Sequence, residues 1–228
     1  MINKRDRSII ISCDVNTLSA LKNLVAKTCD VNGVGGYKIG FELVIPFGIS
    51  AVKKEIRKVT TLPIIYDHQK AATDTPFTAK RFAHVCTSVD AVILFPQAGP
   101  VTEREWIKEC QKKKLGVIVG TEMTHESYLG KDGGFIRDEA PWEIIDIAKK
   151  LKVNRFVVPG NNPEKVRMYR DYLGKDAILY SPGIGTQGGS IELYAKSAGS
   201  FWHAIIGRAI YEAKDIKRAT EEFCTYVR

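Results

Sequence analysis

Short apolar runs alternate with longer amphipathic segments along the whole chain. Eight runs rich in β-branched residues predict buried strands, at residues 8–14, 36–40, 62–66, 91–95, 116–120, 155–158, 177–180 and 201–206. The segments between them have the apolar spacing, capping residues and early prolines of helices, at residues 17–27, 42–58, 79–85, 102–114, 140–151, 163–173, 191–197 and 209–227. The pattern therefore predicts an α/β protein built from eight strand–helix units.

Eight such units favour a closed (β/α)8 barrel, the TIM barrel, in which every strand is followed by a helix. The 228 residues, 44% of them hydrophobic, suit a single barrel domain spanning residues 1–228. No linker or low-complexity segment divides them. An open doubly wound sheet is the alternative, but no G-x-G-x-x-G motif follows the first predicted strand, which weakens a dinucleotide-binding interpretation.

The formal net charge of +8 and the pI of about 9.2 raise the possibility of an anionic partner. The one dense basic run, residues 112–114, closes a predicted helix, where cations complement the helix dipole. No aromatic residues are interleaved with it. We therefore expect no nucleic-acid partner.

The five cysteines are odd in number and lack C-x-x-C spacing. This pattern is typical of a reducing cytoplasm and argues against a disulfide framework or a zinc site. No apolar segment is long enough to span a membrane, and the charged N-terminus is followed by no signal-peptide pattern. We expect a cytoplasmic protein with no membrane partner.

The most informative stretch is residues 64–78, where an apolar strand ends abruptly in Asp67, Lys70 and Asp74. A solvated loop with a surface salt bridge is the simpler explanation of such a trio. However, comparable residues recur after other predicted strands, and in a parallel barrel these positions converge on one mouth. The residues in question are Asp14, Lys38, Asp67, Lys70, Asp74, Thr124, Gln187 and Arg208.

The last two predicted loops indicate an anion site. Residues 183–189 contain four glycines, which allow the backbone to approach a ligand closely. Gly207 and Arg208 open the final predicted helix, where free N–H groups and a guanidinium favour phosphate. In barrels of this type, the loops after strands seven and eight frequently hold phosphate.

At these motifs the chain resembles the orotidine 5′-monophosphate decarboxylases, especially the archaeal forms. The similarity covers nearly the whole chain. It rests on Asp14, on Y-K-I-G around Lys38, on the Asp67/Lys70/Asp74 cluster with D-T-P-F-T, and on T-E-M-T-H, S-P-G-I-G-T-Q-G-G and I-G-R-A-I-Y at residues 121–125, 181–189 and 206–211. One feature departs from the family pattern. The usual D-x-K-x-x-D is here D-x-x-K-x-x-x-D, so that His68 and Gln69 could intrude on the site.

The resemblance implies decarboxylation of orotidine 5′-monophosphate to uridine 5′-monophosphate in pyrimidine biosynthesis, without a metal or organic cofactor. It implies that Lys70 stabilises and protonates the C6 carbanion. Asp67 would lie near the departing carboxylate, either destabilising the ground state or positioning Lys70. Asp74 would complete a charge network with Lys38, and Asp74 and Thr75 would reach the active site of the other subunit of a homodimer.

The same resemblance implies the substrate contacts. Asp14, Lys38 and Thr78 would bind the ribose hydroxyls, and Thr124 the pyrimidine. Gln187 and Arg208 would hold the phosphate, within a substrate-binding set that also includes Pro182, Gly188 and Gly207. Two alternatives remain: an Mg²⁺-dependent sugar-phosphate decarboxylase or aldolase of the same superfamily, and a non-catalytic protein that binds uridine phosphates.

Overall fold

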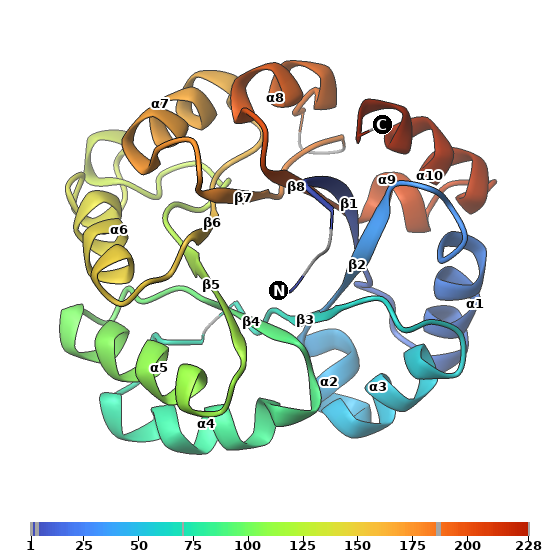
Figure 1. Cartoon of the computed structure of the whole chain (residues 1–228), viewed down its shortest axis with the longest axis horizontal. Coiled ribbons are helices and arrows are strands. Elements are labelled where there is room, and N and C mark those ends of the chain that lie inside the picture. The colour runs from blue at the N-terminus through green and yellow to red at the C-terminus, as the bar shows by residue number, and fades with distance from the viewer. Residues whose placement is uncertain (1, 3–4, 70, 186–187, 228) are drawn as a thin grey trace.

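The computed structural model describes residues 2, 5–69, 71–185 and 188–227. Within these residues eight parallel strands close into a barrel, each paired with the next along the chain and β8 paired with β1 (Figure 1). The strands are β1 (Arg7–Ser12), β2 (Val34–Ile39), β3 (Ile64–Tyr66), β4 (Ala91–Leu94), β5 (Gly116–Gly120), β6 (Arg155–Val157), β7 (Ile178–Ser181) and β8 (Trp202–Ile206). The predicted TIM barrel is therefore confirmed.

Helices surround the barrel as an outer ring (Figure 1). They are α1 (Leu18–Thr28), α2 (Phe41–Phe47), α3 (Ile49–Arg57), α4 (Ala79–Val85), α5 (Pro100–Lys112), α6 (Ala140–Lys150), α7 (Pro163–Leu173), α8 (Ile191–Ala198), α9 (Arg208–Tyr211) and α10 (Ile216–Cys224). Four short 3-10 turns, η1 (Pro76–Thr78), η2 (Cys86–Ser88), η3 (Gly130–Asp132) and η4 (Thr225–Val227), complete the described elements.

Two predicted helices were wrong as single elements. The segment 42–58 divides into α2 and α3 at Gly48, whose φ of +77° is a conformation that favours glycine and ends a helix. The segment 209–227 divides into α9, α10 and η4. Asp215 starts α10 by accepting a hydrogen bond from the N–H of Arg218 at 3.0 Å, which is an N-cap within the segment that we predicted to be continuous.

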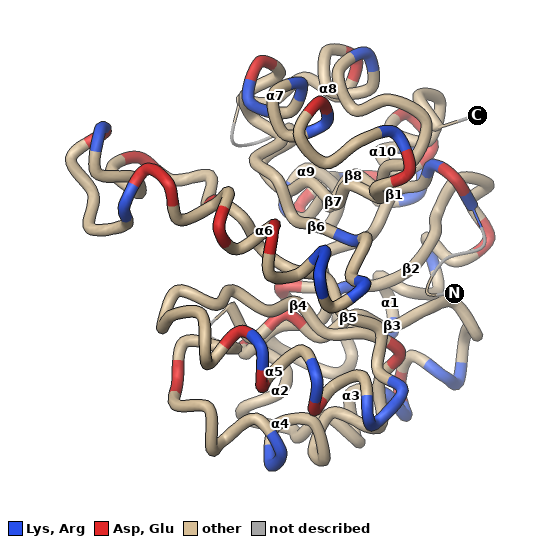
Figure 2. Tube along the Cα trace, turned by 60° about the vertical axis from the view of Figure 1, so that its left-hand side comes forward, with Lys and Arg blue, Asp and Glu red and all other residues tan. Residues whose placement is uncertain are grey.

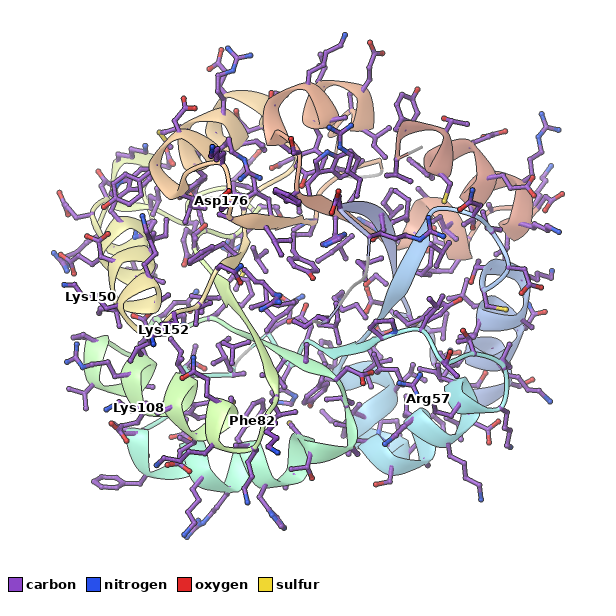
Figure 3. The ribbon with its side chains drawn as sticks, viewed as in Figure 1. Arg57, Phe82, Lys108, Lys150, Lys152 and Asp176 are labelled. Atoms are coloured by element: carbon purple, nitrogen blue, oxygen red, sulfur yellow. The ribbon has the colours of Figure 1, made fainter. Side chains whose placement is uncertain are left out.

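The third strand begins later than the predicted residue 62. Arg57 of α3, labelled in Figure 3, donates to the carbonyl of Leu62 at 2.8 Å and forms an ion pair with Asp90 at the same distance. The Asp90 carboxylate in turn accepts the N–H of Ile64 at 2.8 Å. The backbone before Ile64 is thus bound by side chains, and strand pairing starts only at Ile64.

The apolar core has two layers because alternate residues of each strand face opposite sides. Ile9 and Ile11 belong to the layer between strands and helices, whereas Ile10 belongs to the barrel interior. The interior layer consists of Ile2, Ile10, Ile65, Ala91, Ile93, Phe95, Ile118, Val157, Tyr180 and Ile205. Ile2, near the N-terminus, adds to this layer although it belongs to no strand. Among the described residues, the barrel interior is therefore filled by apolar side chains.

Acidic and basic residues alternate over the outer helices (Figure 2), in keeping with an interspersed surface charge. The segment between β5 and α6 projects from the rest of the molecule in the same view and carries the fully exposed Phe135. Within the described part of the chain, no helix combines the length and apolar character needed to cross a bilayer.

Candidate active site

A cavity of about 230 Å³ opens at the carboxyl ends of the strands. Alternate residues of a strand face the barrel interior, and this alternation continues to the strand's end and past it. Ser12 and Asp14 therefore face the same side as Ile10, and Asp67 the same side as Ile65. The lining residues are Ser12, Asp14, Lys38, Asp67, Gln69, Ile93, Phe95, Glu122, Met123, Thr124, His125, Val157, Pro182, Gly183, Ile184, Ile205, Gly207, Arg208 and Tyr211. The alternation that fills the barrel with apolar side chains thus also aims the polar ones into this cavity.

The floor of the cavity near β1, β2 and β3 carries a buried charge cluster, which we call the triad: Asp14, Lys38 and Asp67. The Lys38 ammonium lies 3.4 Å from Oδ1 of Asp14 and 3.3 Å from Oδ2 of Asp67. Lys38 and Asp67 are each only 5% exposed, whereas the Asp14 side chain is 39% exposed. Ser12 donates its hydroxyl to Oδ2 of Asp14 at 2.7 Å. Three of the predicted site residues are therefore brought together.

The electrostatics of the triad keep Lys38 charged. Burial alone would lower the pKa of the Lys38 ammonium, but the carboxylates of Asp67 and Asp14 outweigh that effect, and its pKa lies above the usual value. Two carboxylates share this single ammonium, so the triad carries one net negative charge. A fixed, desolvated ammonium of this kind is suited to binding hydroxyl or anionic groups of a ligand.

Two residues, His68 and Gln69, follow Asp67 where the usual pattern has one, and they lie differently. His68 points away from the cavity and shares a hydrogen bond of 2.5 Å with the Tyr66 hydroxyl. Gln69 lines the cavity, and its backbone N–H and side-chain amide both donate to the Asp67 carboxylate, at 3.1 and 3.4 Å. The prediction that both residues could intrude on the site is thus wrong for His68 and confirmed for Gln69.

The segment after β5 forms another wall, with Met123, Thr124 and His125. Asn161 donates its side-chain amide to the carbonyl of Thr124 at 3.2 Å. Glu122, 3% exposed, accepts the Tyr169 hydroxyl at 2.8 Å and forms an ion pair with Lys165, both from α7. The sequence alone predicts no role for Glu122, because its partners come from a helix over 40 residues away.

The opposite wall comes from the loops after β7 and β8. Pro182 and Gly207 line the cavity, as does Arg208, which is an exposed residue. Gly207 precedes α9, which is a single turn rather than the start of the long helix that we predicted. The helix-dipole contribution to anion binding is correspondingly smaller, and the Arg208 guanidinium becomes the main cationic group on this side.

Other predicted site residues lie away from this cavity in the single chain. Asp74 and Thr75 are exposed, and α5 holds their backbone, with Thr102 donating to the Asp74 carbonyl at 3.2 Å and Trp106 donating to the Thr75 carbonyl at 3.0 Å. Thr78 donates its hydroxyl to the Thr75 carbonyl at 2.8 Å. Within the described residues, Lys38 forms no ion pair with Asp74.

Gly188 is also outside the cavity lining, and its N–H donates to the Gly185 carbonyl at 2.9 Å. Lys70 and Gln187, the predicted proton donor and one of the predicted phosphate ligands, lie outside the described residues. In the described part of the chain, no group of three or more His, Cys, Asp or Glu side chains has an arrangement that could hold a metal ion.

Comparisons with known proteins agree with this geometry. The sequence model described as "Orotidine 5'-phosphate decarboxylase / HUMPS family" matches residues 7–223. The chain is 34% identical to the orotidine 5′-phosphate decarboxylase of Pyrococcus furiosus over 194 residues, 84% of each chain. It is 30% identical to that of Methanococcoides burtonii over 228 residues, 98% of each chain.

A solved structure shows the same barrel. The orotidine 5′-monophosphate decarboxylase of Methanocaldococcus jannaschii, complexed with the inhibitor BMP, matches with a TM-score of 0.85 at 26% identity, over 97% of this chain and 99% of that one. The enzyme from Pyrococcus horikoshii matches with a TM-score of 0.81 at 25% identity, over 96% and 99%. With matches in both sequence and fold over nearly its full length, the chain belongs to the orotidine 5′-phosphate decarboxylase / HUMPS family.

Proposed function

We propose that this protein catalyses the decarboxylation of orotidine 5′-monophosphate to uridine 5′-monophosphate, without a metal or organic cofactor. The observation that carries the proposal is the triad. A buried ammonium is held between two carboxylates at the mouth of a barrel whose relatives are orotidine 5′-phosphate decarboxylases. Arg208, which lines the same cavity at the end of β8, supplies a cation suited to a phosphate.

The chemistry needs a charge-stabilising acid next to the reacting carbon. When the bond between C6 and the carboxylate breaks, CO2 departs and the electron pair stays on C6, in the plane of the ring. No adjacent carbonyl delocalises that pair, so a fixed ammonium is the simplest stabiliser. We assign this role to Lys70, which then transfers its proton to C6 and regains one from solvent. Asp67 would lie beside the departing carboxylate.

The remaining assignments concern substrate binding. Asp14, Lys38 and Thr78 would contact the ribose hydroxyls, and Thr124 the pyrimidine. Gln187 and Arg208 would bind the phosphate, with Pro182, Gly188 and Gly207 shaping that end of the site. Phosphate binding far from the reacting carbon provides binding energy that can organise the site for the transition state. The presence of Asp14, Lys38, Thr124 and Arg208 around one cavity supports this arrangement.

We also propose a homodimer with shared active sites, in the cytoplasm. Asp74 and Thr75 are exposed in the single chain, as the resemblance requires of residues that serve a second subunit. Large apolar side chains are exposed on the segments that follow β2, β3 and β4, which are neighbours in the barrel. They are Phe41, Ile45, Phe77 and Val101, with exposures of 50, 71, 88 and 56%. An apolar surface of this kind is typical of a protein interface.

The test is the loss of orotidine 5′-monophosphate absorbance on addition of purified protein, with and without EDTA. We expect turnover that EDTA does not reduce, and no measurable turnover by a folded Lys70→Ala variant. Substantial activity in that variant would remove Lys70 from the proton-donor role. Turnover that EDTA abolishes would indicate a metal-dependent relative.

A binding protein is distinguished by a second measurement. If the wild-type protein does not turn over the substrate, yet uridine 5′-monophosphate raises its melting temperature, the pocket binds uridine phosphates without catalysing their formation. In that case the proposed activity is wrong while the proposed ligand class stands.

A further inference from the structure

The residue Gln69 has no role in the assignments above, and the longer spacing of the Asp–Lys–Asp segment brings it into the site. Its φ of +62° lies in the left-handed region, which non-glycine residues seldom adopt. This turn lets the chain fold back after His68, so that Gln69 faces the same cavity as Asp67. This left-handed conformation costs conformational energy, and it places the Gln69 side chain at the cavity.

Gln69 and Lys38 together occupy both oxygens of the Asp67 carboxylate. Oδ1 accepts the backbone N–H of Gln69 at 3.1 Å. Oδ2 accepts the side-chain amide of Gln69 at 3.4 Å and lies 3.3 Å from the Lys38 ammonium. Lys38 and the backbone N–H of Gln69 thus contact one oxygen each. The side-chain amide of Gln69 is a second donor on Oδ2, and its loss leaves that oxygen with the Lys38 contact.

We infer that Gln69 is a positioning residue, which acts on the reaction by holding the Asp67 carboxylate in one orientation beside the substrate. The inference rests on the proposed function, because it concerns the same reaction. Gln69 is an exposed residue, so its side chain is not needed to fill the core. Loss of the side-chain amide should therefore affect the reaction rather than folding.

The first experiment compares Gln69→Met with Gln111→Met. Methionine matches the length of glutamine but cannot donate a hydrogen bond, and the backbone N–H of residue 69 is retained. Gln111 is a matched control, since its amide donates to the Leu151 carbonyl at 2.8 Å on α5, outside the cavity. We expect Gln69→Met to lower kcat about tenfold, the lower end for a hydrogen bond to a charged group. KM should change by less than about threefold, and the melting temperature and the Gln111→Met kinetics should match the wild type.

The variant Gln69→Glu adds a readout that a purely structural role would not move. Its carboxylate at neutral pH would face Asp67 and repel it, whereas its protonated form can donate a hydrogen bond as the amide does. We expect a larger loss of kcat than in Gln69→Met at pH 8, and partial recovery relative to the wild type as the pH falls toward 5.

A double-mutant cycle with Asp67→Asn tests whether Gln69 acts through Asp67. Single-turnover rates with excess enzyme keep slow variants measurable. If Gln69 acts through this carboxylate, Gln69→Met should reduce the rate of Asp67→Asn by less than about twofold. A full tenfold reduction in both backgrounds would overturn the inference, as would a wild-type kcat in Gln69→Met. These outcomes leave the proposed function intact, whereas a wild-type protein without turnover removes both.

Discussion

Two buried carboxylates at the carboxyl ends of the strands have lysine partners, yet their surroundings differ. Asp67, after β3, shares the Lys38 ammonium with Asp14, and all three line the cavity. Glu122, after β5, has Lys165 to itself and also accepts the Tyr169 hydroxyl. Glu122 borders the cavity, whereas Lys165 and Tyr169 of α7 are not among its lining residues, and Lys165 instead lines an adjoining pocket with Glu122.

The difference is consistent with a ligand-binding role for the triad, as proposed above, and a structural role for the Glu122 pair. The Glu122 pair is balanced, with one carboxylate for one ammonium, and it ties the segment after β5 to α7. The triad has two carboxylates for one ammonium and faces the cavity. One carboxylate charge therefore stays unpaired unless a ligand or another part of the site supplies a cation. Burial alone therefore does not distinguish the two clusters, whereas unbalanced charge among the described residues facing a cavity makes the triad the stronger candidate for a functional site.

The substitution Lys38→Met should have the largest effect on activity. The substitution leaves Asp14 and Asp67 facing one another across the site without the shared ammonium. We expect kcat/KM for orotidine 5′-monophosphate to fall by about 100- to 1,000-fold, the cost of removing one preorganised charged donor. Steady-state kinetics, with circular dichroism to verify folding, provide the measurement. An activity within about fivefold of the wild type would show that the triad is structural.

Arg208→Ala tests the cavity wall at the end of β8. Because the guanidinium is exposed and would contact the phosphate rather than the reacting ring, we expect KM to rise by about 30-fold, with kcat changed by less than about threefold. Inhibition by uridine 5′-monophosphate should weaken in parallel. If neither KM nor kcat changes, the phosphate binds elsewhere.

Lys165→Met is the counterpart of Lys38→Met in the balanced pair. It removes the Lys165 ammonium and leaves the Glu122 carboxylate with the Tyr169 hydroxyl among the described residues. We expect the free energy of unfolding to fall by about 2 kcal/mol, less than for a fully buried pair because the Lys165 side chain is 26% exposed. For a chain of this size, this corresponds to a melting temperature lower by roughly 4–8 °C. The value of kcat/KM should stay within about threefold of the wild type. A loss of activity like that of Lys38→Met would erase the distinction between the two clusters.

Glu103 of α5 is a third buried carboxyl, and no salt bridge to it is found among the described residues. It is 1% exposed, and its Oε1 has no hydrogen-bond partner among the described residues. Burial raises its pKa to about 8, so the folded protein holds a proton that the unfolded chain releases near pH 4.5. The wild type should therefore lose stability as the pH rises from about 5 to about 8.

The variant Glu103→Gln should not lose stability in this way as the pH rises, because its amide does not titrate. We expect it to stay close to the wild type near pH 4.5 and to exceed its free energy of unfolding by up to about 5 kcal/mol above pH 8, roughly 10–20 °C in melting temperature, because each pKa unit is worth about 1.4 kcal/mol. Thermal unfolding measured across this pH range provides the test. A difference between the two proteins that does not depend on pH would show that the buried carboxyl is not the cause.

The sequence was sufficient for the barrel because every strand has its own apolar run and every helix its own periodicity. The same periodicity placed Asp14, Lys38 and Asp67 at adjacent strand ends, where the structure brings them together. The break at Gly48 was less visible, because whether a glycine adopts a positive φ depends on the packing of the helices on either side.

The rest of the site depends on contacts that no local pattern contains. The placement of Gln69 follows from one backbone angle in a loop, and the partners of Glu122 come from α7. Asp74 and Thr75 are exposed in the single chain, so their proposed roles depend on the second subunit of the proposed homodimer.

The most direct test of the central claim is the release of CO2 from orotidine 5′-monophosphate by the wild-type protein in the presence of EDTA. The account predicts catalytic release of CO2, with one uridine 5′-monophosphate formed for each CO2 and the same rate when EDTA is omitted. Absence of CO2 release, or release only after a divalent metal is added, would contradict it.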